Sequence, residues 1–344
     1  MKRWAGLFGI VCVMGLVGCL PSPPPATTTT TATSATSPPT SSPPTTTPTS
    51  TTSITTTTST TTSTTVPTGM WLPTADKPLK LTWVLADISK LSPSEVLNLQ
   101  TKNLAGQTIP QADVYDLDGE YATKAQVDYL HSKGKKVICY FDAGVYETYR
   151  SDAYKFPKSV IGNPDEGWND SFWLDVRQIP ILEPIMKARI QMCKDKGFDS
   201  IEPDEITNWS NNPGFPITYN DQLVYNKALA GWAHEAGLSI GLKGDIEHAH
   251  DLVDYFDWTL NEECFQYSEC LSVENVGPGA DGKSHPGLQL FTQQNKAVWV
   301  AEYKKVGNTA SCNTSIQNRF NTAWYKFGLP KNGGRTDCGS FTPR

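Results

Sequence analysis

The feature that most constrains the fold is an alternation, repeated over residues 70–344, of short apolar runs with segments of helical spacing. The short runs are rich in β-branched and aromatic residues, as strands are, and the longer segments place apolar residues three and four positions apart. This order predicts a parallel sheet covered by helices on its faces. Strands are expected at Leu81–Ala86, Val114–Leu117, Lys136–Asp142, Ser200–Asp204, Leu238–Lys243, Trp258–Glu262, Val298–Glu302 and, with the weakest pattern, Tyr325–Leu329.

Helical patterns cover Ala125–Lys133, Ile181–Lys196 and Asp221–Ala236. Gly134 and Gly197 follow two of them, at the position where glycine commonly ends a helix. Eight strand–helix units favour closure into a single (β/α)₈, TIM-like barrel, and residues 70–344 have about the length of that fold, roughly 250 residues. The alternative is a doubly wound open sheet.

The first 19 residues have the composition of an export signal. Lys2 and Arg3 precede a mostly apolar stretch at 4–17, which is shorter than the roughly 20 residues that span a membrane. Leu16-Val17-Gly18-Cys19 resembles a bacterial lipobox, so Cys19 is expected to carry a lipid. The protein is therefore predicted to be secreted and anchored at the cell surface, with membrane contact through that lipid. A plain signal peptide and an uncleaved anchor are the alternatives.

Residues 20–69 consist almost wholly of Thr, Ser and Pro and contain no charged or aromatic residue. Such a segment cannot bury enough apolar surface to offset the entropy lost on ordering. We expect a disordered stalk between the anchor and the folded domain.

The folded domain is acidic. All 35 Asp and Glu lie in residues 70–344 together with 27 of the 29 Lys and Arg, which gives this segment a formal charge of −8. This charge argues against a nucleic-acid partner and is compatible with a cationic substrate. We expect a monomer.

Six cysteines remain once Cys12 is removed with the leader and Cys19 is set aside for lipid: Cys139, Cys193, Cys264, Cys270, Cys312 and Cys338. Exported proteins meet oxidising conditions, so disulfides are expected, although six cysteines allow 15 pairings. No CxxC or HxxxH spacing occurs among the residues of the domain, so we expect no metal site.

Two pairings follow from position in the chain. Cys264 and Cys270 would close a short loop, and Cys312 with Cys338 would fasten the C-terminal segment. Cys139 lies inside a core strand and is expected to be a buried apolar thiol.

Carboxylates occupy the ends of nearly all the expected strands. In a barrel these ends converge on the face that carries the active site. Solvated strand ends would show mixed polar chemistry, whereas here carboxylates dominate and aromatic residues stand beside them, which suits a sugar with its hydroxyls and apolar faces. The side chains expected to bind substrate in one open groove are Asp116, Asp118, Tyr140, Asp142, Glu202, Glu205, Lys243, Glu263 and Glu302, around Asp204 and Glu262.

Several ordered blocks resemble glycoside hydrolase family 114, the endo-α-1,4-polygalactosaminidases. The blocks are VYDLDG at 114–119, VICYFDAG at 137–144, WLDVR at 173–177, GFDSIEPD at 197–204, GLSIGLK at 237–243 and NEECFQYSEC at 261–270. The likeness runs from about Trp71 to Tyr303. It implies a TIM-like barrel that needs no cofactor and cleaves within chains of α-1,4-linked galactosamine or its N-acetyl form.

The resemblance implies that Asp204, in the Glu-Pro-Asp block, and Glu262, in the Asn-Glu block, are the catalytic pair of a retaining enzyme. Glycoside cleavage needs one carboxylic acid to protonate the leaving oxygen and one carboxylate to attack C1 or activate water. Asp204 would be the nucleophile and Glu262 the general acid/base. Otherwise, Asp204 is a helix N-cap and Glu262 a rim residue bonded to a loop amide.

The chain departs from the family pattern at Glu205, where Asn is common, and at Glu263, where Gln is common. Each adds a possible negative charge beside a catalytic carboxylate and could raise its neighbour's pKa. Lys243 would either hold the nucleophile ionised or pair with one of these two carboxylates.

Two other functions remain open at this point. One is a surface-displayed polysaccharide-binding protein on an inactive barrel. The other is a glycosidase for a different sugar, since a fold and a carboxylate pair do not fix the epimer.

Overall fold

The computed structural model describes residues 69–339. The expected leader, with Cys19, and nearly all of the Thr/Ser/Pro-rich segment lie outside the described residues. Within 69–339, no helix has the length and apolar character that crossing a membrane requires.

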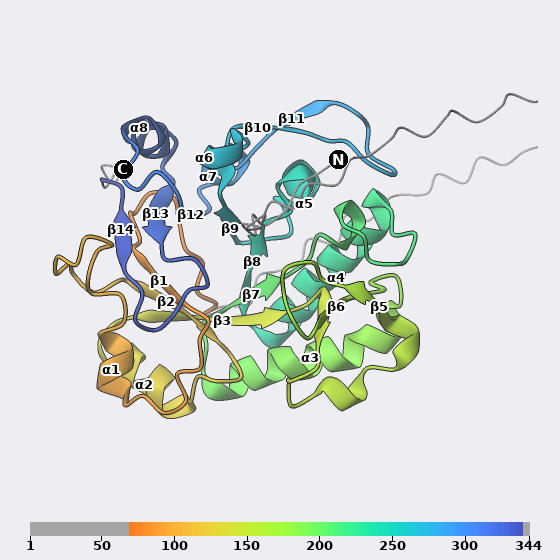
Figure 1. Ribbon diagram of the computed structural model, residues 1–344, viewed down its shortest axis with the longest axis horizontal. Coiled ribbons are helices and arrows are strands. Elements are labelled where there is room, and N and C mark those ends of the chain that lie inside the picture. Colours follow the sequence, from red (N-terminus) through yellow and green to blue (C-terminus); the bar gives the residue numbers. More distant parts are fainter. Residues whose placement is uncertain (1–68, 340–344) are drawn as a thin grey trace, which may run out of the picture. The chain divides into compact units, whose positions relative to one another are not determined.

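A nine-stranded sheet forms the wall of a nearly closed barrel (Figure 1). Eight of its strands are parallel, and β14 pairs antiparallel with β13 at one edge. In spatial order the strands are β1 (Leu81–Val84), β2 (Val114–Asp118), β3 (Lys136–Asp142), β7 (Ser200–Asp204), β8 (Ser239–Lys243), β9 (Trp258–Glu262), β12 (Val298–Glu302), β13 (Asn321–Tyr325) and β14 (Arg335–Asp337). This is the predicted TIM-like architecture, and the open doubly wound sheet is excluded.

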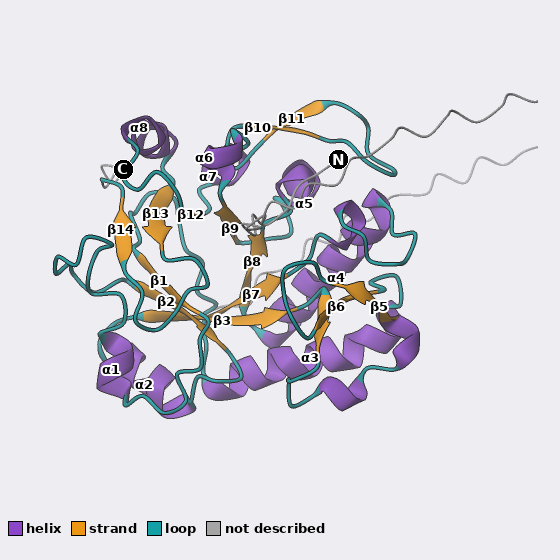
Figure 2. Cartoon of the chain, viewed as in Figure 1, coloured by secondary structure: helices purple, strands orange, loops and turns teal. Residues whose placement is uncertain are grey.

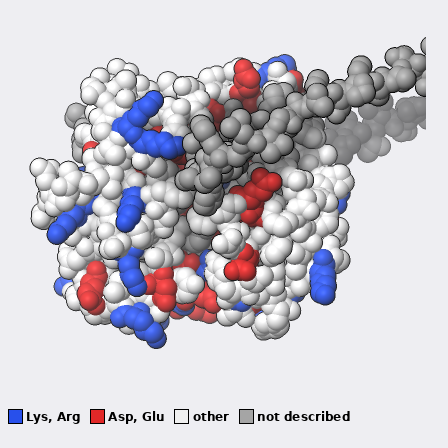
Figure 3. Space-filling model, in the orientation of Figure 1, with Lys and Arg blue, Asp and Glu red and all other residues white. Residues whose placement is uncertain are grey.

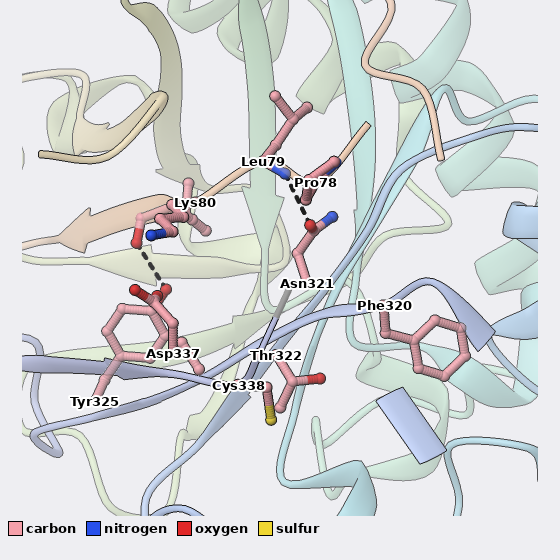
Figure 4. A pocket seen from close by; sticks show the side chains of 12 residues that line it. Pro78, Leu79, Lys80, Phe320, Asn321, Thr322, Tyr325, Asp337 and Cys338 are labelled. Carbon is pink, nitrogen blue, oxygen red and sulfur yellow. Dashed lines mark hydrogen bonds between the residues drawn. The ribbon is translucent and has the colours of Figure 1, made fainter. Parts of the chain in front are cut away.

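Side chains bridge the seam between β1 and β13, the first and last of the parallel strands. The Asn321 side-chain oxygen accepts a hydrogen bond from the Leu79 amide at 2.8 Å, and the Tyr325 hydroxyl donates to the Leu81 carbonyl at 2.9 Å. Figure 4 shows the small pocket that lies at this seam, with Leu79 and Asn321 on its wall. The pocket lies beside the starts of β1 and β13, whereas the predicted catalytic residues end β7 and β9.

Helices surround the sheet (Figure 2). Thr123 and Thr218 begin two of them as capping boxes, and Gly197 and Gly237 end two in the left-handed conformation. The helices are α1 (Pro93–Leu97), α2 (Lys124–Ser132), α3 (Ile179–Lys196), α4 (Tyr219–Ala236), α5 (Ala249–Leu252), α6 (Cys264–Tyr267), α7 (Gln289–Gln293) and α8 (Thr309–Asn318), with 3₁₀ turns at Ala153–Lys155, Lys158–Val160, Asn208–Ser210 and Ile246–His248.

Two small antiparallel sheets are built from the connections. One joins β4 (Val145–Glu147), β6 (Ser171–Leu174) and β5 (Ile161–Pro164) between β3 and α3. The other is the hairpin of β10 (Ser272–Glu274) and β11 (Ser284–Pro286), which follows α6. Both insertions follow the carboxyl ends of barrel strands, where this fold places its functional loops.

Alternation along each strand divides the core in two. Inward positions such as Trp83, Trp258 and Trp299 fill the barrel interior, and outward positions such as Val137 and Ile201 pack against the helices. Trp258 lies so close to β8 that a Cβ on Gly241 would be 2.4 Å from its ring. The barrel interior is therefore filled by indole rings, and Gly241 leaves the space that the Trp258 ring occupies.

The predicted strands are confirmed except for the eighth. That strand is Asn321–Tyr325, and the prediction of Tyr325–Leu329 is wrong. Residues after Tyr325 turn, with Gly328 and Leu329 at φ 76° and 46°. Leu329 is buried because this turn packs on the barrel, and the apolar pattern does not distinguish the two cases.

The disulfides Cys264–Cys270 and Cys312–Cys338 are present as predicted. The prediction for Cys139 is wrong, because it forms a disulfide with Cys193. Cys139 occupies an outward position of β3 and meets Cys193 on α3 within the core between sheet and helices. The position of Cys139 in a buried strand does not indicate that it bonds to a cysteine 54 residues away in the sequence.

The filled interior makes a stability prediction. Gly241→Ala should lower the free energy of unfolding by about 1–3 kcal/mol, because the added methyl meets the Trp258 ring. Gly231→Ala is the matched control, since Gly231 lies within α4 and a methyl group added there would have no neighbour within 4 Å. The Gly231→Ala change should raise the free energy of unfolding by up to about 1 kcal/mol, because alanine has a higher helix propensity than glycine. Denaturant titration of both variants checks this; equal effects would contradict the packing argument.

Candidate active site

Lys243 lies at the centre of the cluster at the carboxyl ends of the barrel strands. It ends β8, between β7 and β9, and its ammonium is 2.8 Å from Asp204 Oδ1 and 2.9 Å from Glu262 Oε2. The side chain is 5% exposed. Burial disfavours its charge, but the carboxylates of Asp204, Glu262 and Glu202 raise the pKa of Lys243 well above its ordinary value. The ammonium is therefore a permanent positive charge between the two predicted catalytic groups.

This bridge limits the separation of the two carboxylates. Because the contacts measure 2.8 and 2.9 Å, the two bound oxygens lie no farther apart than their sum, about 5.7 Å. The two carboxylates also come from separate strands on either side of β8. Asp204 and Glu262 thus sit on one face of the barrel and within reach of one another.

Glu262 has a second partner. The hydroxyl of Tyr303, which directly follows β12, donates a hydrogen bond to Glu262 Oε1. Burial and the adjacent Glu262 raise the pKa of Tyr303 well above its ordinary value, so the hydroxyl keeps its proton. Lys243 and Tyr303 therefore hold the two oxygens of Glu262 separately.

The backbone around Asp204 is set by a close approach of two loops. Asp204 Oδ1 accepts from the Glu205 amide at 2.8 Å, and Glu205 has a φ of 56°, a conformation in which a non-glycine residue is uncommon. A Cβ on Gly144 would lie 1.6 Å from the Glu205 carbonyl oxygen. Glycine is thus required at 144 for β3 and β7 to end side by side.

Glu205 and Asp165 bring further carboxyl groups to the Asp204 side. Burial, then the charges of Asp204 and Asp165, raise the pKa of Glu205 well above its ordinary value. Burial and Asp204 raise the pKa of Asp165 to about 7. Asp165 directly follows β5, so the small sheet inserted after β3 reaches the catalytic rim.

Asp116 and Glu202 lie below Lys243, fully buried in the barrel. Glu202 Oε2 accepts from the Trp83 indole at 3.0 Å, while both oxygens of Asp116 have no donor among the described side chains. Glu202 Oε1 likewise has no hydrogen-bond partner among the described residues. Burial, and then the Asp204 charge, raise the pKa of Asp116 to about 7 even though Lys243 and Glu202 oppose the shift. These two predicted substrate ligands form the floor of the site.

Asp118 and Asp142 both form ion pairs with Arg150, a buried residue that was not among the predicted site residues. Its guanidinium is 2.7 Å from Asp118, 2.6 Å from Glu147 and 3.3 Å from Asp142. Asp142 also accepts from the Tyr140 hydroxyl at 3.1 Å. Burial and Glu147 raise the pKa of Asp142 well above its ordinary value. This cluster fixes the loop after β4 against β2 and β3.

Glu302 contacts the loop after β9, and Glu263 is part of that loop. Glu302 Oε1 accepts from the Phe265 amide at 2.9 Å and thereby anchors α6. Glu263 stands at the N-terminal end of α6 with a φ of 57°, and its nearest cation is Lys304 at 3.9 Å. Lys243 pairs with neither Glu263 nor Glu205 but with the two central carboxylates.

Sequence reasoning thus identified the central residues and missed several of their neighbours. Arg150 and Asp165 lie in loops with no strand-end pattern. Arg177, at the end of the WLDVR block, donates two hydrogen bonds to Asp175. Among residues 69–339 no group of three metal-binding side chains is close enough to hold a metal ion. On the face drawn in Figure 3, acidic side chains gather toward the middle and the lower edge.

The sequence profile of glycoside-hydrolase family GH114 matches residues 61–338. The chain belongs to this family. It is a glycoside hydrolase, and the cluster around Lys243 lies where barrel enzymes carry their active sites.

Solved structures agree with this assignment. The chain is similar to Ega3 of Aspergillus fumigatus, solved in complex with galactosamine, with 27% identity, a TM-score of 0.61 and coverage of 78% of this chain and 97% of that one. A variant of the glycoside hydrolase domain of PelA from Pseudomonas aeruginosa shares the fold at 13% identity and a TM-score of 0.50, over 74% and 97% of the two chains. Among curated proteins no relative matches the chain.

The raised pKa of Asp116 makes a prediction about pH. In the folded GH114 domain this group binds its proton up to about pH 7, whereas in the unfolded chain it releases it near its ordinary value of about 4. The folded state therefore holds more protons between those values, and stability falls as pH rises through that window.

Asp116→Asn should reduce this fall, because the amide is neutral and can donate to Glu202. Unfolding by denaturant at several pH values between 4 and 8 measures the slope. Asp128→Asn, at an exposed helix position paired with Lys124, is the control and should leave the slope unchanged. An unaltered slope in Asp116→Asn would disprove the buried-proton assignment.

Proposed function

We propose that this GH114 enzyme cleaves within chains of α-1,4-linked galactosamine or N-acetylgalactosamine and retains the anomeric configuration. Asp204 is the nucleophile and Glu262 is the general acid/base. The supporting observation is the Lys243 bridge, which brings one oxygen of each carboxylate within about 5.7 Å of the other. Retaining enzymes place their carboxyl groups about 5–5.5 Å apart, and inverting enzymes place them about 6.5–9.5 Å apart to admit a water.

The environment of Asp204 suits a nucleophile. Its Oδ1 accepts hydrogen bonds from the Lys243 ammonium and the Glu205 amide, both at 2.8 Å. These donors orient the carboxylate, while Oδ2 takes part in neither contact. Oδ2 is therefore the oxygen that forms the bond to C1 of the sugar.

Glu262 has to hold a proton before that attack and accept one after it. As C1 bonds to Asp204, Glu262 gives its proton to the leaving oxygen. The ester no longer carries the Asp204 charge, so ionised Glu262 can take a proton from the water that attacks C1 and frees Asp204. Tyr303 and Lys243 keep the carboxylate of Glu262 in place throughout.

The choice of an amino sugar rests on charge and on similarity. The domain carries a formal charge of −8, and Asp165, Glu205 and Glu263 surround the catalytic pair with further carboxyl groups. Ega3, a protein of similar fold and sequence, was solved with galactosamine. The net negative charge of the domain favours a sugar with a free ammonium. The proposal therefore favours deacetylated stretches of the polymer.

The first test is release of reducing ends from α-1,4-linked polygalactosamine in acetylated and deacetylated form. The wild type should release them, with a rapid fall in polymer length because cleavage is internal. Asp204→Asn and Glu262→Gln keep the side-chain shape and should lower kcat by at least about 10³-fold while substrate still binds. Binding without any cleavage by the wild type would favour the alternative of a polysaccharide-binding protein on an inactive barrel.

The stereochemical proposal has its own measurement. Proton NMR of the first product released by the wild type should show the α anomer before mutarotation. The β anomer would make Asp204 a base that activates water, because direct displacement by water inverts the centre. On an aryl glycoside with a good leaving group, Glu262→Gln should carry out the first step at nearly the wild-type rate, because departure of that group needs no proton. The second step, attack of water on the ester, should become slow because the general base is missing.

A further inference from the structure

Two exposed aromatic side chains meet above the rim of the barrel. The rings of Trp168 and Phe327 lie nearly parallel, at 20°, with centroids 6.4 Å apart. Trp168 is 52% exposed and Phe327 is 65% exposed. Rings that pack to stabilise a core are buried, whereas these two present a joint apolar surface to solvent.

The two residues come from separate sectors of the barrel. Trp168 is in the turn between β5 and β6, within the insertion that follows β3. Phe327 is in the turn that follows β13. Strands β1 and β2 lie between β13 and β3 on one side, and β7, β8, β9 and β12 lie between them on the other. The contact therefore joins two loops across the mouth of the barrel rather than two neighbours along its edge.

Each end of this contact is tied to one of the two central carboxylates. The Phe327 ring meets the Tyr303 ring edge to face at 5.3 Å, and the Tyr303 hydroxyl bonds to Glu262. Three residues before Trp168, Asp165 lies close enough to Asp204 for that charge to raise its pKa, and its carbonyl accepts a hydrogen bond from the Trp168 amide. The aromatic pair thus extends from the Asp204 side of the site to the Glu262 side.

We propose that Trp168 and Phe327 form an aromatic subsite that stacks on a hexosamine ring of the bound polysaccharide, next to the bond that is cleaved. This inference rests on the proposed function and adds residues that neither the strand-end pattern nor the carboxylate cluster contains. The occupant follows from the surroundings. A pyranose offers an apolar C–H face to a ring, and its hydroxyls and ammonium suit the adjacent carboxylates.

The free ammonium of a deacetylated sugar is also attracted to the face of an indole or phenyl ring. Stacking would hold the ring in a fixed orientation while Tyr303 keeps Glu262 beside the leaving oxygen. Because the subsite is made by two loops that contact each other, substrate has to slide beneath the rings or part them. Binding should therefore depend on both residues.

The experiment measures binding and turnover separately. Asp204→Asn supplies an inactive background in which the Kd for a purified α-1,4-galactosamine oligosaccharide is measured by calorimetry. Adding Trp168→Ala or Phe327→Ala should raise this Kd about tenfold, and adding Trp168→Phe should restore most of the affinity because a ring remains. In the otherwise wild-type enzyme the same alanine changes should raise KM for the polymer and leave the pH profile of kcat unchanged.

Tyr255→Ala is the matched control. Tyr255 is another partly exposed aromatic residue, 44% exposed, but it precedes β9 at the opposite end of the strand from Glu262 and packs beside Lys227. It should change neither Kd nor KM. Thermal unfolding of every variant shows that the fold is retained, and Phe327→Tyr gives a second conservative comparison should the alanine variant unfold.

The outcomes separate this inference from the proposed function. Cleavage of the polymer by the wild type with unchanged Kd and KM in both alanine variants would overturn the aromatic subsite and leave the enzymatic proposal intact. Absence of cleavage with a ring-dependent Kd would overturn the enzymatic proposal and leave a sugar-binding aromatic pair. Absence of oligosaccharide binding in the Asp204→Asn background would overturn the subsite as well.

Discussion

The site depends on one buried ammonium placed between carboxylates. Without Lys243, the ends of β7 and β9 would bring Asp204 and Glu262 together with no compensating charge, and Glu202 lies beneath them as a third acid. Burying charge is costly unless it is paired, so the position of Lys243 on the strand between them is a condition for the cluster to exist. The same contact keeps the two carboxylates close, and this closeness is the geometric basis for the proposed retaining chemistry. The pairing of the buried charges and the closeness of the two carboxylates are thus both consequences of one ion triad.

The barrel supplies the rigidity that such a triad needs. Its interior below the site is filled by indole rings, and Gly241 provides the space that Trp258 occupies. Above this layer, burial raises the pKa of both Asp116 and Glu202, which reduces the negative charge under Lys243. Apolar packing at the bottom, a neutralised acid pair in the middle and the ion triad at the top form successive layers.

Loops add the features that distinguish this site from a bare barrel rim. Arg150 collects three carboxylates and fixes the insertion after β3, and that insertion brings Asp165 and Trp168 toward the site. The turn after β13 brings Phe327 from the far side. Proteins of one fold commonly differ in such loops, because a strand end can move little while a loop can be exchanged. Substrate choice in this enzyme is therefore expected to reside in these insertions.

The sequence alone determined the strand–helix order, seven of the eight parallel strands and the central residues Asp204, Lys243 and Glu262. These follow from short-range patterns, because alternation of side chains and the convergence of parallel strand ends are fixed by backbone geometry. Tertiary structure decided which polar groups meet. The Cys139–Cys193 bond, the Arg150 cluster and the Trp168–Phe327 contact each join segments far apart in the chain. Local periodicity carries no information on such contacts, since they depend on how loops fold over a barrel that already exists.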